Sequence, residues 1–236
     1  IGDIKEILKR INPMLKKQDH SDWMAHVMDL KEKYPASYCT DGLSGPFVVE
    51  EIYRQTKGDA IMVTEVGQHQ MWTAQYYKYA KPHRLLTSGG LGTMGYGLGA
   101  AIGAQIGNPD KQVVNVAGDG CFRMNMNEVA TAVRENLPLI EVIINNHVLG
   151  MVRQWQELFF NHRYSFTQML SPDFGLIAKA NGIEYSLVEQ RGELDDAVSR
   201  MLMHKGPYVM EVRVENEENV FPMVPAGAEL SQIMLE

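Results

Sequence analysis

The chain has 236 residues, of which 45% are hydrophobic and 22% charged, a balance that suits a globular protein with a sizeable core. Its 22 basic and 29 acidic side chains give a net charge of −7, which argues against a nucleic-acid partner. Charged residues interrupt every apolar stretch before the roughly 18 residues that a membrane span needs, so we expect no membrane partner.

Residues 1–35 are expected to form two amphipathic helices and no strand. Apolar residues recur at helical spacing from Ile4 to Ile11 and again from Trp23 to Leu30. The chain begins without an initiator Met and without the features of a signal peptide. We therefore expect a fragment of a longer protein, in which this helical segment is a linker or the tail of a preceding domain.

From about residue 47 the sequence alternates between strand and helix patterns. The extended segments are expected at 59–67, 83–88, 112–117, 139–144, 183–188 and 207–214. The main helices are expected at 47–57, 68–79, 92–107, 126–136, 148–160 and 194–202. This alternation predicts an α/β domain over residues 36–236, with a doubly wound, mostly parallel sheet and helices on both faces. In such sheets, ligands bind beyond the carboxyl ends of the strands.

Several helix boundaries carry local signals. Asn125 with Glu128 three residues later resembles a capping box. Ser171 followed by Pro172 predicts a helix with Ser as its cap and Pro at its first position. The glycines of 92–107 each cost roughly 1 kcal/mol of helix propensity relative to alanine, which indicates close approach by another backbone or a ligand.

Two strand ends carry the polar residues with the clearest chemistry. One apolar strand ends in the run Gly118–Gly120, the next ends in Asn145-Asn146, and residues 121–144 lie between them. Each run alone is common turn chemistry. Together they bring the Asp119 carboxylate and an amide oxygen toward one point, a pattern that resembles the thiamine-diphosphate (ThDP) signature.

Magnesium would suit these donors, because it takes six oxygens and few of them from protein. The Asp119 carboxylate, the Asn146 amide oxygen and one backbone carbonyl would supply three, with diphosphate and water completing the shell. Gly118 and Gly120 would let backbone amides approach phosphate oxygens, and the helix that follows adds a favourable dipole.

A dinucleotide site is the competing interpretation of the glycine-rich segment. Residues 90–95 match GxGxxG, and Asp119 follows at nearly the spacing of a ribose-binding acid. Against it, the preceding strand is only Leu85-Leu86, and the acid is flanked by glycines, which suits a turn around an ion.

The helix at 148–160 and two histidines lie next to this predicted site. Apolar residues from Met151 to Phe159 recur at helical spacing, which is typical of a core stripe. Trp155 is the candidate to line a pocket mouth. His69 and His147 flank the site, although a histidine in a loop is usually a neutral surface group.

Five segments carry a resemblance to a known family: TEVGQHQMW (64–72), SGGLGTMGYGLGAAIGAQIG (88–107), GDGCFRMNMNEVATAV (118–133), NNHVLGMVRQWQELFFNHRYSFT (145–167) and FPMVPAGAEL (221–230). Over about 35–236 the chain resembles the C-terminal ThDP-binding domain of acetohydroxyacid synthase (acetolactate synthase) catalytic subunits. MVRQWQELF and FPMVPAGA favour this family over pyruvate oxidases, and its FAD-containing biosynthetic type over the catabolic type. Residues 1–20 resemble the end of the family's FAD-binding domain.

The resemblance implies site residues. Magnesium would be held by the side chains of Asp119 and Asn146 and the backbone carbonyl of Val148. The residues expected around the diphosphate are Val66, Gly67, Gln68, His69, Gly118, Asp119, Gly120 and Cys121. Those expected around the aminopyrimidine, with Met94 as an apolar wedge, are Gly92, Met94 and Met124. Those expected beside the rest of the cofactor are Leu149, Gly150 and Met151. Trp155 would lie at the substrate channel, and Cys121 departs from the family's more usual serine.

The resemblance also implies an activity. The family is a transferase that joins pyruvate to a second pyruvate or to 2-oxobutyrate with loss of carbon dioxide, in branched-chain amino acid biosynthesis. Its cofactors are ThDP and magnesium, with a structural FAD in the full-length enzyme. We expect a homodimer or tetramer of catalytic subunits, a regulatory small subunit, and a cytoplasmic location, or an organellar one in a eukaryote. The two cysteines, Cys39 and Cys121, suit such a reducing compartment.

The resemblance places the activating glutamate in an N-terminal domain of the partner subunit, so no catalytic residue is expected in this chain. Glu65 is expected on the diphosphate side and would not replace it. We therefore predict that the chain alone is inactive. The alternatives are another ThDP-dependent 2-oxo-acid decarboxylase or carboligase, and a non-catalytic module that binds a nucleotide or serves in assembly.

Overall fold

The structure is a computed structural model that describes residues 1–38, 41–216 and 218–235. The chain divides into two compact units, Ile1–Ser37 and Tyr38–Glu236. Cys39, one of the two cysteines behind the prediction of a reducing compartment, lies outside the described residues.

The first unit is helical, as its pattern predicts. It holds α1 (Ile4–Ile11), a short 3-10 helix η1 (Asn12–Met14) and α2 (Ser21–Lys33). The Asp3 carboxylate caps α1 by accepting a hydrogen bond from the Glu6 N–H at 3.0 Å. All residues of these helices are described, and none is buried. That this unit is a linker or domain tail stays a prediction.

The second unit is built on one six-stranded sheet with the order β2-β1-β3-β4-β6-β5, in which every neighbouring pair is parallel. Its strands are β1 (Ile61–Thr64), β2 (Leu85–Thr87), β3 (Val113–Gly118), β4 (Ile140–Asn145), β5 (Glu184–Val188) and β6 (Tyr208–Arg213). The order reverses direction between β1 and β3, so the first ligand crevice to consider lies at their carboxyl ends.

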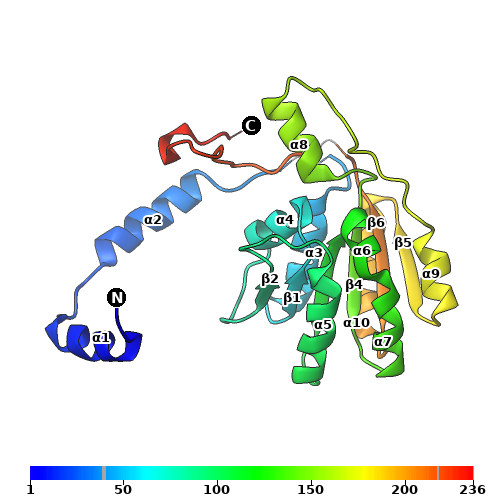
Figure 1. The fold of residues 1–236 in the computed structure, drawn as a ribbon, viewed down its shortest axis with the longest axis horizontal. Coiled ribbons are helices and arrows are strands. Elements are labelled where there is room, and N and C mark those ends of the chain that lie inside the picture. Colours follow the sequence, from blue (N-terminus) through cyan, green and yellow to red (C-terminus); the bar gives the residue numbers. More distant parts are fainter. Residues whose placement is uncertain (39–40, 217, 236) are drawn as a thin grey trace. The chain divides into compact units, whose positions relative to one another are not determined.

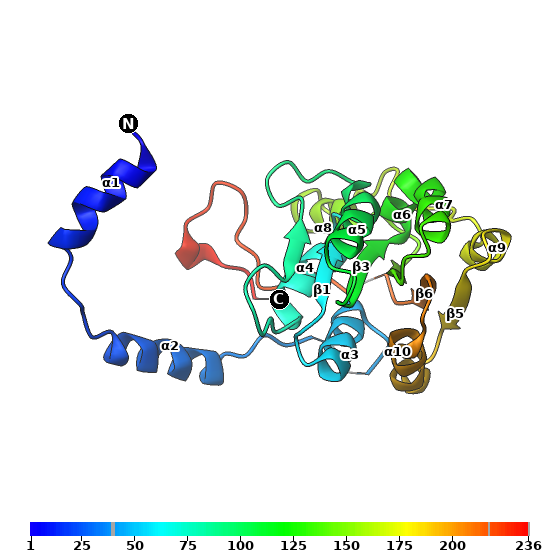
Figure 2. The ribbon, with the colours of Figure 1, turned by 90° about the horizontal axis from the view of Figure 1, so that it is seen from below.

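Helices cover both faces of this sheet, which confirms the predicted doubly wound α/β fold. The helices are α3 (Gly45–Thr56), α4 (Gln68–Tyr76), α5 (Tyr96–Gly107), α6 (Asp119–Asn125), α7 (Val129–Arg134), α8 (Gly150–Phe159), α9 (Phe174–Ala180) and α10 (Leu194–Met203). Short 3-10 helices are η2 (Met126–Glu128), η3 (Arg191–Glu193) and η4 (Leu230–Gln232). Figures 1 and 2 show α3 and α10 on one side of the sheet and α5, α6 and α7 on the other.

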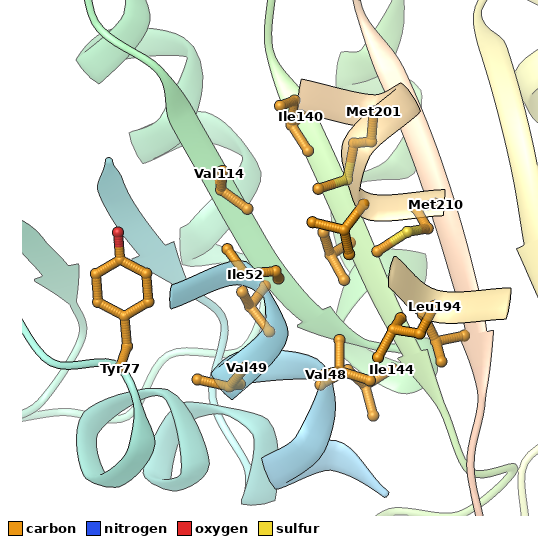
Figure 3. Packing of buried hydrophobic residues seen from close by; sticks show 14 of the residues in the cluster. Val48, Val49, Ile52, Tyr77, Val114, Ile140, Ile144, Leu194, Met201 and Met210 are labelled. Carbon is orange, nitrogen blue, oxygen red and sulfur yellow. The ribbon is translucent and has the colours of Figure 1, made fainter. Parts of the chain in front are cut away.

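Alternate residues of the central strands feed two separate cores, because successive side chains point to opposite faces. Figure 3 shows Val114 of β3 and Met210 of β6 packed against Ile52 of α3 and Met201 of α10. On the other face, Val113, Ile143 and Val209 pack with α5, α6 and α9, chiefly through Leu98, Phe122 and Phe174. A sheet buried on both faces explains the nearly continuous apolar strands.

Three local predictions about helix boundaries are wrong. The helix expected at 92–107 begins only at Tyr96, because Gly92 and Gly95 take left-handed conformations with φ of 69° and 90°. The capping box does not form: the Asn125 amide donates to the Gly95 carbonyl, and Glu128 accepts from Thr131 instead. The helix predicted over 126–136 is accordingly divided into η2 and α7.

The third error concerns the start of α9. Asp173 is the cap, since its carboxylate accepts from the Leu176 N–H at 2.8 Å. Ser171 lies before the cap and its hydroxyl serves a different partner, described below. Among the described residues no helix is long and apolar enough to cross a membrane.

Candidate functional site

A cavity of about 280 Å³ lies at the carboxyl ends of β1, β3 and β4, beside α8. Figure 1 shows α8 beyond one end of the sheet, and β3 leads directly into α6. Fifteen predicted residues line the cavity: Val66, Gly67, Gln68, His69, Gly92, Met94, Gly118, Asp119, Gly120, Cys121, Asn146, Val148, Leu149, Gly150 and Met151. Its wall also contains Gln70, Met71, Trp72, Ile144 and Val152, which sequence reasoning treated as ordinary helix or strand positions.

Three other candidates lie outside this wall. Met124, predicted near the aminopyrimidine, is on α6 with 53% of its surface exposed. Trp155 is 39% exposed, and its ring lies 4.9 Å from that of Phe159 on the same helix. His147 is exposed and takes a left-handed conformation with φ of 57°.

Asp119 is the one carboxylate in the cavity wall, at the first position of α6. It is 1% exposed. The Ser171 hydroxyl donates to its Oδ2 at 2.7 Å, while its Oδ1 is buried and has no hydrogen-bond partner among the described residues. Burial raises the pKa of Asp119, and the bond from Ser171 opposes that rise. A buried acceptor without a donor is uncommon, and a cation is a partner that suits a carboxylate oxygen.

The two asparagines at the end of β4 have different hydrogen-bond partners. Asn145 points into the sheet, where its amide donates to Glu211 Oε1 at 2.8 Å. Asn146 lines the cavity, and its Oδ1 accepts from the Val148 N–H at 3.2 Å. Its Nδ2 donates to Gln68 Oε1 at 3.4 Å. Of the pair, only Asn146 has an amide oxygen at the cavity.

The glycines around the cavity let its loops approach closely. Gly67 has φ of 148°, a conformation that L side chains rarely adopt. A Cβ on Gly150 would lie 2.0 Å from Gln68 Oε1, and one on Gly118 would lie 3.0 Å from the His69 ring. Any side chain at these positions would therefore displace a wall residue.

His69 and Cys121 are buried in the wall in their uncharged forms. Burial lowers the pKa of His69 to about 3, and its Nε2 has no hydrogen-bond partner in the described part of the chain. The Cys121 thiol donates to the Val66 carbonyl at 2.9 Å, and burial raises its pKa to about 12. Neither group adds charge to the site at neutral pH.

Glu65 follows β1 but does not line the cavity, and that it lies on the diphosphate side stays a prediction. Its carboxylate accepts from the backbone N–H groups of Gly95, Gly97 and Leu98 at 2.7, 2.9 and 3.2 Å. Glu65 thus caps α5, whose first N–H groups would otherwise be unpaired. Burial raises the pKa of Glu65, and the three backbone donors oppose the rise.

The oxygen atoms in the cavity wall suit a hard cation that takes most of its ligands from phosphate and water. Within residues 1–38, 41–216 and 218–235, no three His, Cys, Asp or Glu side chains form a ready-made metal cage. The cavity instead offers the unpaired Asp119 Oδ1 and the Asn146 amide oxygen. One carboxylate with neutral oxygens is what Mg²⁺ uses when phosphate oxygens and water supply the remaining ligands.

Comparisons with known proteins identify the family to which the domain is similar. Residues 65–212 match the family described as thiamine pyrophosphate enzyme, C-terminal TPP binding domain. The chain is 39% identical over 236 residues to the acetolactate synthase isozyme 2 large subunit of Escherichia coli (strain K12), covering 99% of this chain and 42% of that protein. It is 40% identical over 251 residues to acetolactate synthase 1, chloroplastic, of Nicotiana tabacum, covering 100% and 38%.

A third relative is the mitochondrial acetolactate synthase catalytic subunit of Saccharomyces cerevisiae, 38% identical over 239 residues, covering 98% of this chain and 34% of that protein. The chain therefore spans between 34% and 42% of the length of these relatives. The matched segment begins at Glu65, directly after β1, and includes β3 and β4, whose ends form the cavity together with the end of β1. From the match over 65–212 and the fold that surrounds the cavity, the chain belongs to the family of C-terminal TPP-binding domains of thiamine pyrophosphate enzymes.

Proposed function

We propose that this domain binds ThDP with Mg²⁺ as part of an acetolactate synthase catalytic subunit. The observation that carries the proposal is the Asp119 carboxylate, which is 1% exposed in the wall of the cavity and has one oxygen unpaired among the described residues. A buried carboxylate oxygen without a donor costs free energy in the ligand-free protein. A divalent cation would remove that cost.

The residues around Asp119 support a division of the cavity. Asp119 and Asn146 would hold Mg²⁺ through side-chain oxygens, and Val148 through its carbonyl. The wall that would face the diphosphate comprises Gly67, Gln68, His69, Gly118, Gly120 and Cys121. The residues proposed for the aminopyrimidine are Gly92 and Met94, and those for the rest of the cofactor are Leu149, Gly150 and Met151. When bound, ThDP supplies the stabilisation of a carbanion that decarboxylation of a 2-oxo acid requires.

The substrates we propose are pyruvate and a second pyruvate or 2-oxobutyrate. Full-length relatives are named acetolactate synthase, and this chain matches them over nearly its whole length at about 40% identity. Trp155, half-exposed one helical turn beyond Met151, would contact the incoming substrate. FAD, an assembly of catalytic subunits with a regulatory subunit, and a cytoplasmic or organellar location belong to the same proposal.

The chain alone is proposed to be inactive. Glu65, the buried glutamate nearest the cavity in sequence, already accepts three backbone hydrogen bonds from α5. It is therefore committed to the fold and is not available to exchange a proton with the cofactor. Acetolactate formation by the purified 236-residue chain, measured with pyruvate, ThDP and Mg²⁺, would contradict this point.

Isothermal titration calorimetry tests the cofactor assignment. The chain should bind ThDP in the presence of Mg²⁺, more weakly with EDTA, and should not bind NAD. Asn146→Ala should weaken the Mg²⁺-dependent binding, while Asn145→Ala, at the neighbouring position that faces the sheet, controls for damage to the end of β4. Binding of NAD in place of ThDP would overturn the proposal. In the complete subunit, a product other than acetolactate from pyruvate alone would assign another carboligase.

A further inference from the structure

Three buried side-chain amides link the cavity to the C-terminal segment 218–221. Asn146 Nδ2 donates to Gln68 Oε1 at 3.4 Å, and Gln68 Nε2 donates to Gln154 Oε1 at 3.1 Å. Gln154 then bonds to both sides of the backbone at Val220, accepting from its N–H at 2.9 Å and donating to its carbonyl at 3.0 Å. We call Asn146, Gln68, Gln154 and the Val220 backbone groups the amide chain.

The amide chain has a direction that is set at its Val220 end. A backbone N–H can only donate and a backbone carbonyl can only accept. Val220 therefore determines which end of the Gln154 amide is oxygen and which is nitrogen. With the Gln154 oxygen fixed, Gln68 must present its nitrogen to it and its own oxygen to Asn146.

Two further backbone groups require the same direction. Gln68 Nε2 also donates to the Glu218 carbonyl at 2.9 Å, which again fixes its nitrogen on the side of the segment 218–221. At the other end, the Val148 N–H donates to Asn146 Oδ1 at 3.2 Å, which fixes that atom as oxygen. Since amide orientation is determined by such networks, the agreement of three backbone groups leaves one arrangement.

The space around the amide chain is built for it. Gln154, Gln68 and Asn146 are 0%, 4% and 8% exposed, so water cannot substitute freely for a lost bond. A Cβ on Gly150 would lie 2.0 Å from Gln68 Oε1 and 3.0 Å from Asn146 Nδ2. Gly150 therefore leaves the room in which the Asn146–Gln68 bond forms.

We propose that Gln154 is a positioning residue for the metal site. It transmits the orientation of the Val220 backbone through Gln68 to Asn146, so that the Asn146 oxygen, and not its nitrogen, faces the cation. The segment 218–221 therefore helps to orient a metal ligand, although it supplies no ligand itself. This inference rests on the proposed function, in which Asn146 is a ligand of Mg²⁺.

Coupling of this kind is reciprocal. If docking of 218–221 orients Asn146, then binding of Mg²⁺ and ThDP must strengthen the docking of 218–221. The Val220 N–H, whose acceptor is Gln154 Oε1, should exchange with solvent more slowly when Mg²⁺ and ThDP are present.

The same helix provides a matched control. Gln156 bonds to a backbone residue in the same way, since its Oε1 accepts from the Ser165 N–H at 2.7 Å and its Nε2 donates to the Ser165 carbonyl at 3.1 Å. It does not bond to the amide chain or to 218–221 through any described contact. Gln154→Met and Gln156→Met therefore each remove a pair of hydrogen bonds between a glutamine of α8 and a backbone residue. Only Gln154→Met should affect Asn146.

The first experiment needs no ligand. In the ¹⁵N-labelled chain, the Asn146 side-chain NH₂ should exchange slowly in the wild type and in Gln156→Met, and at least about tenfold faster in Gln154→Met. Equal exchange in all three proteins would overturn the amide chain itself. If Gln154→Met does not fold, exchange of the wild-type Val220 N–H with and without Mg²⁺ and ThDP decides, and no change would overturn the coupling.

The second experiment measures the Mg²⁺ concentration for half-maximal ThDP binding. Gln154→Met should raise it about tenfold, the order of one lost hydrogen bond, and Gln156→Met should not. In an Asn146→Ala background, Gln154→Met should add nothing, because it acts through Asn146. If Gln154→Met raises the required Mg²⁺ concentration as much in the Asn146→Ala background as in the wild type, Gln154 has only a structural role. That result would overturn the inference. If Asn146→Ala itself has no effect, the metal assignment of the proposed function fails instead.

Discussion

Glu65 and Asp119 are two buried carboxylates at the ends of neighbouring parallel strands, β1 and β3, and they differ in how their oxygens are satisfied. Glu65 accepts three backbone hydrogen bonds. Asp119 accepts one from Ser171 and has an unpaired oxygen among the described residues. Both are 1% exposed, and burial raises the pKa of both. The comparison teaches that acidity and position alone do not single out a site. The proposed metal site rests on an oxygen of Asp119 that has no described donor and belongs to a residue of the cavity wall.

The largest effect is expected at Asp119. Asp119→Asn keeps the shape and an acceptor for Ser171 but removes the charge, so Mg²⁺-dependent ThDP affinity should fall about a hundredfold, or about 2.7 kcal/mol. Calorimetry measures this. Stability of the ligand-free protein should stay equal or rise, because a buried charge is removed. Retained affinity would show that the unpaired oxygen has no metal-binding role.

The matched change at Glu65 should act on stability instead. Glu65→Gln places an NH₂ group among the three α5 donors, which leaves backbone N–H groups unpaired in the interior. We expect a loss of between about 2 and 3 kcal/mol in the free energy of unfolding, measured in urea. The Mg²⁺ concentration for half-maximal ThDP binding should change little. A variant with wild-type stability and lost cofactor binding would reverse the roles assigned to the two carboxylates.

The pH dependence of stability separates these carboxylates from His69. The folded pKa of His69 is about 3 against an ordinary 6.5, so the unfolded chain binds more protons between these values and stability falls as pH drops below 6.5. The carboxylates act oppositely: with raised folded pKa values, they lower stability as pH rises above their ordinary 3.8 and 4.5.

His69→Asn removes the histidine contribution. Between pH 7.5 and pH 5, the difference in urea-measured stability should shift in favour of the variant by about 2 kcal/mol. A difference that does not change with pH would show that His69 is solvated in the folded protein. Asp119→Asn is the comparison of opposite sign at lower pH, since it removes a group whose raised pKa destabilises the fold as pH rises above 3.8.

The smallest effect is expected at Ser171. Ser171→Ala removes the donor to Asp119 Oδ2 and leaves the carboxylate free to rotate. Mg²⁺-dependent affinity should fall about tenfold, the lower end for loss of an outer-shell bond. Ser186→Ala, at a half-buried residue of β5 whose buried hydroxyl has no described partner, is the control. Equal affinities in the two variants would remove Ser171 from the site.

The overall fold and most of the cavity could be predicted, because both depend on local patterns. Alternating strand and helix patterns predict a parallel sheet, and a parallel sheet brings every strand end to one edge. GDG and NN therefore had to meet once β3 and β4 became neighbours, as their pairing from Val114 to Gly118 shows.

What could not be predicted are side-chain choices among distant partners. Ser171 has the local signature of a helix cap, yet its hydroxyl bonds to Asp119, 52 residues away. Glu65 follows a strand in the same manner as Asp119, and only the fold shows that α5 begins over it. Gln154 lies in an apolar helical stripe, and its partner Val220 is 66 residues later. No local spacing encodes such contacts.

The bond from the Cys121 thiol to the Val66 carbonyl has a chemical consequence for handling the protein. A thiol with a pKa of about 12 is essentially un-ionised at neutral pH, and the thiolate is the form that alkylating agents and peroxides attack. Iodoacetamide should therefore leave Cys121 unmodified while the domain is folded. The Cys121 sulfur beside the cavity is thus protected from oxidation by the same burial that shapes the cavity wall.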